Sequence, residues 1–312
     1  MTYSIVARDP ASGQLGVAVQ SHFFAAGRVV PWARAGVGAV ATQSFAEPSY
    51  GSLGLALMGA GQSAESALTA LVTVDPAADR RQVAMVDARG GVAAHTGTGC
   101  VGAAGHCSDH QVSAQANMMA RPTVWKAMIE AYSRAHGDLA SRLLEALEAA
   151  AAEGGDLRGQ QSAALVVVSG ELTGRPWQDL LIDLRVDDHS DPVGELGRLL
   201  QLDRAYQRIG AAFEPILQGS QGELEAVDDQ IDGLARAQEV LGANFESTFW
   251  RGVLLARSGR MAEAREALTQ AARSHAGWAE MLRRLPEAGL LDAPSEVLDW
   301  LLDDSTSLTN RG

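Results

Sequence analysis

The order of strand-like and helix-like segments constrains this fold more than any other feature of the sequence. Residues 2–8 and 14–20 are apolar runs rich in β-branched side chains, and Asp9-Pro10-Ala11-Ser12-Gly13 between them is a strong turn signal. The chain therefore opens with a β-hairpin. A third apolar run at 36–43 predicts another strand, and helical spacing follows over 53–58 and 63–73.

The next part of the chain returns to strands and then alternates again. Two helices are predicted over 122–152, with a break near Gly137. Few connections have the spacing of a βαβ repeat, so a doubly wound parallel sheet is disfavoured. The pattern instead favours an α+β fold of antiparallel sheets with helices packed outside them. Further strands are predicted at 83–87, 91–96, 111–115, 162–169 and 180–186.

Beyond Pro192 the sequence predicts helices only. The last clear feature is a helical hairpin of the tetratricopeptide kind over 245–274, in which Gly252 lies where the two helices would cross closely. We therefore expect a mixed first domain and a small all-α second domain. The predicted domains are 1–212 and 222–312, joined by a linker near 218–222.

The charge balance excludes several classes of partner. Asp and Glu number 38 against 25 Lys and Arg, which gives a net charge of −13. Nucleic acids and anionic membranes bind clustered cations, so neither is an expected partner. No stretch approaches the ~20 apolar residues of a membrane span, and the first residues lack the pattern of a signal peptide. We expect a cytoplasmic protein.

The scarcity of lysine and cysteine narrows the chemistry. Lys126 is the only lysine, and no glycine-rich loop precedes it, which argues against Schiff-base chemistry and a P-loop. Cys100 and Cys107 cannot build a disulfide framework, which fits a reducing compartment. A zinc site from these cysteines with His106 and His110 would need two adjacent ligands, which structural zinc sites avoid. We expect no metal and no cofactor.

Thr2 is the most informative single residue. Removal of Met1, which a small second residue favours, would leave a threonine whose α-amine, with a pKa near ~8, lies beside its own hydroxyl as a general base. Many chains begin Met-Thr without any catalytic role. Here Thr2 directly opens the predicted hairpin, so its position would be fixed by the sheet.

Several segments resemble the bacterial family catalogued as domain of unknown function 1028. The similarity covers about residues 1–200. It implies the fold of the N-terminal nucleophile hydrolases, an αββα four-layer sandwich, and amide-bond hydrolysis by Thr2. It also implies that the chain from Phe213 onward corresponds to a C-terminal extension labelled as peptidoglycan-binding. The matching segments are 2–9, 13–19, 30–43, 159–165 and 184–189.

Acyl transfer also needs neutral donors for the developing oxyanion. Gln115 and Asn117 alternate on one face at a strand end, and the family resemblance includes this Gln-x-Asn pattern. We take Asn117 as a catalytic candidate and Gln115 as a substrate-binding one, although Asn at a strand end also forms turns. Gln43 and Glu47, close after the third strand, are further substrate-binding candidates.

Charged residues supply the remaining candidates for substrate binding. Proteasome-type threonine hydrolases use a lysine where Arg34 stands here; an arginine cannot accept a proton but can bind a carboxylate or form a surface ion pair. The strand period places Asp183, Arg185 and Asp187 on one face. That face would either shape a binding site or form a salt-bridge network at an interface.

Two functions of different classes are consistent with these patterns. The first is an amidohydrolase that acts on a small polar amide or ureido compound through Thr2. The second is a non-catalytic scaffold that keeps the hydrolase fold, with the C-terminal helices binding a partner or a peptidoglycan fragment. In either case we expect a homo-oligomer. The state of the N-terminus separates the two, since only the enzyme needs a free Thr2.

Overall fold

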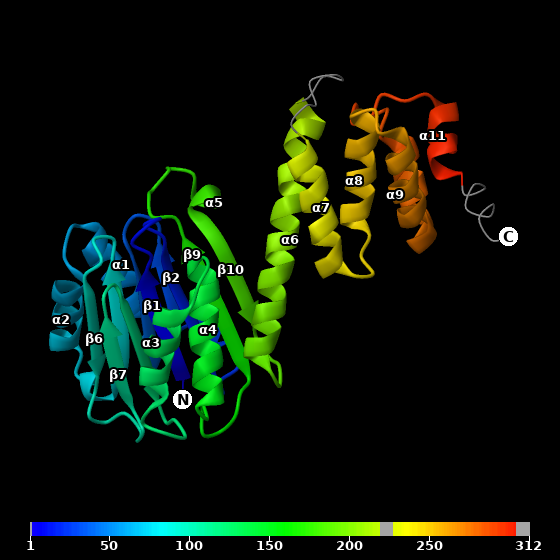
Figure 1. The fold of residues 1–312 in the computed structure, drawn as a ribbon. Coiled ribbons are helices and arrows are strands. Elements are labelled where there is room, and N and C mark those ends of the chain that lie inside the picture. The colour runs from blue at the N-terminus through cyan, green and yellow to red at the C-terminus, as the bar shows by residue number, and fades with distance from the viewer. Residues whose placement is uncertain (1, 219–226, 304–312) are drawn as a thin grey trace. The chain divides into compact units, whose positions relative to one another are not determined.

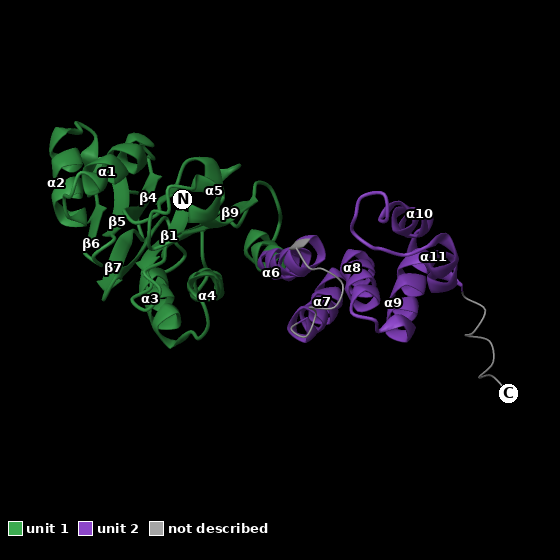
Figure 2. Ribbon diagram, turned by 90° about the horizontal axis from the view of Figure 1, so that it is seen from above, with its two compact units in different colours: residues 1–199 green, residues 200–312 purple. Residues whose placement is uncertain are grey.

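The computed structural model describes residues 2–218 and 227–303, and the chain forms two compact units, Met1–Leu199 and Leu200–Gly312 (Figure 2). The division falls inside helix α6 (Pro192–Gln218), earlier than the predicted domain end, because Ala205 and Ile209 of this helix already pack in the core of the second unit. The predicted linker near 218–222 lies almost entirely outside the described residues.

Unit 1 contains two antiparallel sheets, as the sequence predicts. The larger has the order β10-β9-β2-β1-β8-β7, and the smaller has the order β3-β4-β5-β6. The strands of the larger sheet are β1 (Thr2–Arg8), β2 (Leu15–Ser21), β7 (Gly105–Asp109), β8 (Val112–Asn117), β9 (Ser162–Val168) and β10 (Leu180–Val186). Those of the smaller sheet are β3 (Pro31–Arg34), β4 (Gly38–Ser44), β5 (Arg81–Asp87) and β6 (Val92–Thr96).

The two sheets face each other between two pairs of helices. α1 (Ser49–Gly59) and α2 (Ala64–Val74) pack on the smaller sheet, while α3 (Val124–Arg134) and α4 (Leu139–Ala152) pack on the larger one. Figure 2 shows the two pairs on opposite sides of the strands. Short helices η1 (Ala26–Arg28), η2 (Ala78–Arg80) and α5 (Pro176–Asp179) lie in the connections (Figure 1).

Two helices of unit 1, α2 and α4, begin at residues whose side chains cap the first turn. The hydroxyl of Ser63 accepts a hydrogen bond from the backbone N–H of Ser66 at 3.1 Å, which satisfies one free donor of the first turn of α2. Asp138 caps α4 in the same way, accepting from the N–H of Ser141 at 2.9 Å.

The alternation of side chains along β1 explains how the site is placed. Val6 packs with Ala84 and Val86 of β5 in the apolar core between the sheets. Gly16, opposite Ala7, lies against Leu143 of α4, so the other face of the sheet meets the helices. Thr2 and Ser4 share the face of Val6. The inter-sheet space is therefore apolar at one end and polar at the end where β1 begins.

Unit 2 consists of helices only in its described part. Its core surrounds Phe249, whose ring stacks on Trp278 at 4.9 Å and meets Trp250 edge-on at 5.2 Å. The predicted hairpin is confirmed, with its turn at Gly259, whose φ is +77°. Besides the second half of α6, the helices are α7 (Asp228–Leu241), α8 (Glu246–Arg257), α9 (Met261–Ser274), α10 (Ala276–Arg284) and α11 (Ser295–Leu302).

Candidate functional site

A cluster of neutral polar side chains fills the inter-sheet space at the start of β1. Cross-strand pairing brings its members together, because Thr2 lies opposite Asn117, Ser4 opposite Gln115, and Gln43 opposite Gln82. Polar groups are costly to bury unless they form hydrogen bonds, so a cluster of this size needs an internal network. The buried members are Thr2, Ser4, Gln43, Gln82, Ser113, Gln115 and Asn117.

Gln43 is the centre of that network. Its Oε1 accepts from Ser4 Oγ at 2.7 Å, and its Nε2 donates to Gln82 Oε1 at 2.8 Å and to the Thr2 carbonyl at 3.2 Å. Asn117 Nδ2 donates to the same Gln82 oxygen at 2.9 Å and to the Thr2 carbonyl at 3.4 Å. Gln82 Nε2 in turn donates to the Ala116 carbonyl at 2.9 Å. The network thus holds the backbone of Thr2 from two strands.

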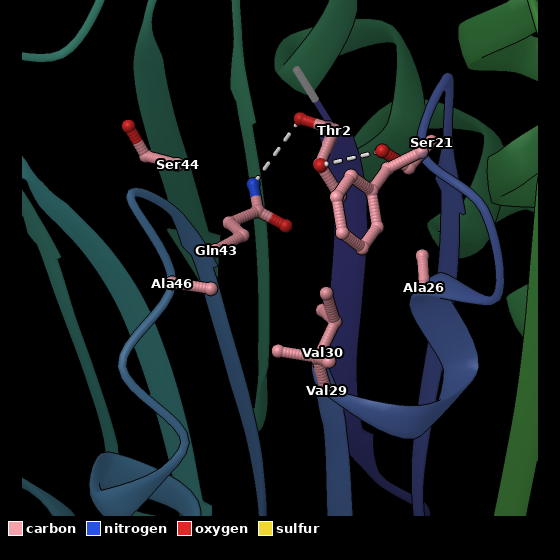
Figure 3. Close-up of a pocket in the computed structure, with 9 residues that line it drawn as sticks. Thr2, Ser21, Ala26, Val29, Val30, Gln43, Ser44 and Ala46 are labelled. Atoms are coloured by element: carbon pink, nitrogen blue, oxygen red, sulfur yellow. Dashed lines mark hydrogen bonds between the residues drawn. The ribbon is translucent and has the colours of Figure 1, made fainter.

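The hydroxyl of Thr2 faces a cavity of about 240 Å³. Its Oγ1 is 2.9 Å from Ser21 Oγ, the residue directly opposite it on β2. Figure 3 shows Thr2, Ser21 and Gln43 at one end of this cavity and Val29 and Val30 at the other. The lining residues are Thr2, Ser21, Phe23, Ala26, Val29, Val30, Gln43, Ser44 and Ala46.

Ser44 combines two unusual features at the wall of this cavity. Its φ is +71°, in the left-handed region that costs an ordinary L residue about 1–2 kcal/mol. Its Oγ is buried and has no hydrogen-bond partner among the described residues. Figure 3 shows this hydroxyl pointing away from Thr2, so Ser44 contributes to the cavity wall without directing its Oγ at the nucleophile.

Asp156 lies directly beside the start of β1. The Ser21 carbonyl accepts a hydrogen bond from the N–H of Gln161, so the backbone groups of Ser21 point toward β9. Backbone groups of successive residues in a strand point to opposite sides, so those of His22 point toward β1. The N–H of His22 donates there to Asp156 Oδ2 at 3.2 Å, and Asp156 also bridges to Met119, just after β8. The Asp156 carboxylate therefore lies between the extensions of β2 and β8, ahead of Thr2.

Asp156 is itself buried and held in place. Arg158 Nη2 lies 3.2 Å from its Oδ2, and the N–H of Arg158 donates to its Oδ1 at 2.9 Å. Burial of the Tyr3 phenol, with the negative charge of Asp156 and of Asp191 close by, raises the pKa of Tyr3 above its usual range.

The structure separates the sequence-predicted site residues into two groups. Gln43, Gln115 and Asn117 join Thr2 in the buried cluster. Arg34 pairs with Gly38 at the far end of β4, about 17 Å from Gln43 along the strand. Glu47 accepts from the N–H of Ser49 at 3.1 Å and lines a second cavity together with Asp75 instead.

The charged face of β10 does not line the Thr2 cavity. Arg185 Nε lies 2.8 Å from Asp183 Oδ1, so these two residues form an ion pair on an edge strand, on one face as the strand period predicts. Asp187 acts through its carbonyl, which accepts from the N–H of Ala25 at 3.0 Å. That bond supports the loop before η1, whose Ala26 lines the cavity.

Gln82, Ser44 and Asp156 are among the residues of the site that sequence analysis missed. Gln82 has a local signal, since the strand period places it on the face of Ala84 and Val86, where a buried polar residue is conspicuous. Ser44 and Asp156 have none. Their placement depends on a backbone torsion angle and on a loop that returns from α4.

No group of three or more His, Cys, Asp or Glu side chains within 2–218 and 227–303 is arranged to hold a metal ion. Cys100 Sγ donates to the Arg81 carbonyl at 3.4 Å, and His106 Nδ1 lies 2.9 Å from Thr96 Oγ1. Burial, with His95 nearby, lowers the pKa of His106. Across the same part of the chain, every helix is too short or too polar to cross a membrane.

Comparison with known proteins identifies the family. Residues 2–196 match the model of a family of unknown function, DUF1028. The chain belongs to the DUF1028 family. A crystal structure of a DUF1028 protein, SPO2555 from Silicibacter pomeroyi, is similar, with 30% sequence identity and a TM-score of 0.58 over 64% of this chain and 88% of that one. No curated protein matches the chain. The DUF1028 match ends close to the end of unit 1, so the helical unit lies outside it.

Proposed function

We propose that this DUF1028 protein hydrolyses amide bonds with Thr2 as an N-terminal nucleophile. One observation carries the proposal: Thr2 is the first residue of a central strand, and its hydroxyl faces a cavity while its backbone is held by a buried amide network. The two facing antiparallel sheets between helical layers also support our inference that unit 1 is an αββα sandwich of the N-terminal nucleophile class.

The proposed reaction begins when cleavage of the Met1–Thr2 bond frees the α-amine of Thr2. That amine accepts the hydroxyl proton as Thr2 Oγ1 attacks the substrate carbonyl, and it passes the proton to the departing amine nitrogen. The C–N bond breaks and an ester to Thr2 remains. Water then attacks this ester, the same amine accepts a proton from the water, and Thr2 Oγ1 leaves as the hydroxyl.

The surrounding residues have separate roles in this proposal. Both amide protons of Asn117 already have acceptors, Gln82 and the Thr2 carbonyl, so Asn117 is a positioning residue rather than the oxyanion donor. Asp156, beside the start of β1, stabilises the ammonium that forms when the α-amine takes up the proton.

Two measurements test the proposal. Intact-mass spectrometry of the purified chain should show loss of Met1, and a screen of small amides should detect turnover by this protein. Thr2→Ala should abolish turnover, whereas Thr2→Ser should retain part of it because serine keeps both the hydroxyl and the α-amine. A mass that retains Met1 on every molecule, or turnover that survives Thr2→Ala, contradicts the proposal and favours a non-catalytic scaffold.

A further inference from the structure

We propose that the acyl group of the substrate is apolar and about the size of an aryl-acetyl or branched-chain acyl group. This inference rests on the proposed function and assigns the substrate class at the same cavity. It replaces the polar or ureido substrate that the sequence suggests.

The chemistry of the cavity wall is the first argument. Hydroxyl and amide groups gather at the Thr2 end, where the scissile amide would lie, and none of the described residues that line the cavity carries a charge. A polar substituent bound there would lose its water without gaining enough hydrogen bonds. The apolar part of the wall is formed by Phe23, Ala26, Val29, Val30 and Ala46.

The size of the cavity is the second argument. An apolar cavity of about 150 Å³ holds a benzene molecule. The present cavity of about 240 Å³ therefore has room for an aromatic ring and a short linker to the carbonyl carbon at Thr2, but not for a peptide chain. The volume therefore limits the part of the substrate that lies inside the cavity to a small group.

Exposed aromatic rings on the two loops that line the cavity are the third argument. Phe23 and Phe24 are each 58% exposed and Phe45 is 51% exposed, although the chain has only 6 phenylalanines. Phe23 itself lines the cavity, and Phe45 lies between Ser44 and Ala46, which both line it. The exposed ring of Phe23, which lines the cavity, would gain from covering an apolar ligand.

The charged candidates do not change this conclusion. Arg34 lies at the far end of β4, and Glu47 lines the other cavity. Asp183 and Arg185 neutralise each other on β10. Asp156 pairs with Arg158, and neither residue lines the Thr2 cavity. Apart from the Thr2 α-amine that takes part in the proposed reaction, a charged acyl group would therefore meet no charged partner in the cavity wall.

Equilibrium binding to the full-length Thr2→Ala protein tests the inference without requiring turnover. Isothermal titration calorimetry would compare phenylacetamide with acetamide and with N-carbamoylglycine, a charged ureido compound. We expect phenylacetamide to bind at least about tenfold more tightly than either of the others, because its ring leaves water. Equal affinities, preferential binding of N-carbamoylglycine, or no binding of phenylacetamide would each overturn the inference.

Variants locate the binding to this cavity. In the same Thr2→Ala background, Val29→Asp should remove the preference for phenylacetamide, since it places a carboxylate in the apolar wall. Val74→Asp is the matched control because Val74 is 77% exposed at the end of α2 and should leave the preference unchanged. Ala46→Leu, which fills the cavity without adding charge, gives the same information if Val29→Asp fails to fold. Preference that survives both cavity variants would overturn the inference.

The outcomes separate this inference from the proposed function. If the Thr2→Ala protein prefers phenylacetamide but the wild-type protein hydrolyses no amide, the cavity assignment stands and the enzymatic proposal fails. If the wild-type protein hydrolyses polar amides through Thr2 faster than apolar ones, the enzymatic proposal stands and the substrate class fails.

Discussion

At the residue scale, the site depends on polar groups whose hydrogen bonds are nearly all used internally. The side-chain amides of Gln43 and Asn117 donate hydrogen bonds to the Thr2 carbonyl and to Gln82. These bonds fix the nucleophile, but they leave few free N–H donors for a substrate. Two atoms are exceptions, because the buried Ser44 Oγ and Asn117 Oδ1 have no hydrogen-bond partner among the described residues. The amide hydrogen bonds therefore fix the position of Thr2 before any substrate binds.

The backbone strain at Ser44 has a measurable cost. Ser44→Gly should raise the free energy of unfolding by roughly 1 kcal/mol, because glycine adopts the +71° φ without strain. Ser44→Ala is the matched control, since it removes the hydroxyl but keeps a Cβ at the same φ, and it should be less stable than Ser44→Gly by about that amount. Urea unfolding measures both variants, and equal stability of the two would contradict the strain.

Asp156 should control the pH dependence of the reaction. A carboxylate beside the Thr2 α-amine favours the ammonium form and therefore raises the pKa of the amine. Asp156→Asn removes this charge, so the acidic limb of the kcat/KM profile should move to lower pH. Asp183→Asn, which changes a carboxylate on β10 away from the cavity, is the control and should leave the profile in place. A profile that does not move in Asp156→Asn would show that Asp156 acts only structurally.

At the element scale, strong local signals predicted most of the strands and helices, and long-range pairing decided the rest. The hairpin of β1 and β2 and the hairpin of α8 and α9 carry both periodicity and turn residues, and both were predicted. β7 has the sequence Gly-His-Cys-Ser-Asp, which has no apolar alternation, and β3 has only four residues and begins with proline. Pairing with β8 and β4 forms these strands.

The same limit applies to the site. Thr2, Gln43, Gln115 and Asn117 could be predicted because each lies in or next to a predicted strand. Asp156 could not be predicted, because its position ahead of Thr2 depends on the loop that connects α4 to β9. Its distance along the sequence predicted that Arg34 lies near Thr2. In the structure, β3 runs in the direction that puts Arg34 at the opposite end of the sheet.

The close crossing of α8 and α9 requires a residue without a side chain at Gly252. A Cβ on Gly252 would lie 2.6 Å from Leu268 Cγ and 3.3 Å from its backbone nitrogen, so Gly252→Ala should lower the free energy of unfolding of the helical unit by about 1–3 kcal/mol. Gly233→Ala is the matched control, since its Cβ meets nothing closer than 4.0 Å. It should stabilise α7 by about 1 kcal/mol through helix propensity. Thermal unfolding by circular dichroism measures both, and equal effects would contradict the close crossing.

At the scale of the whole molecule, every described residue of the candidate site lies in unit 1. The cavity and the amide network use residues between Thr2 and Asn117, and Asp156 belongs to the same unit. The core of unit 2 is separate and includes α6 from Ala205 onward. We therefore expect the reaction proposed for Thr2 to be independent of the helical unit, whose own role is a separate question.

A chain that ends after Arg204 tests this independence. It keeps the buried Leu196 and Leu200 of α6 and omits Ala205, the first residue of the helical core, so we expect it to fold and to hydrolyse the same amide with unchanged kcat. The matching Thr2→Ala truncation is the control for contaminating activity, and circular dichroism checks the fold. A folded truncation without turnover would mean that the helical unit supplies a group to the reaction. A raised KM with unchanged kcat would instead assign it to substrate capture, since uniform binding energy affects KM alone.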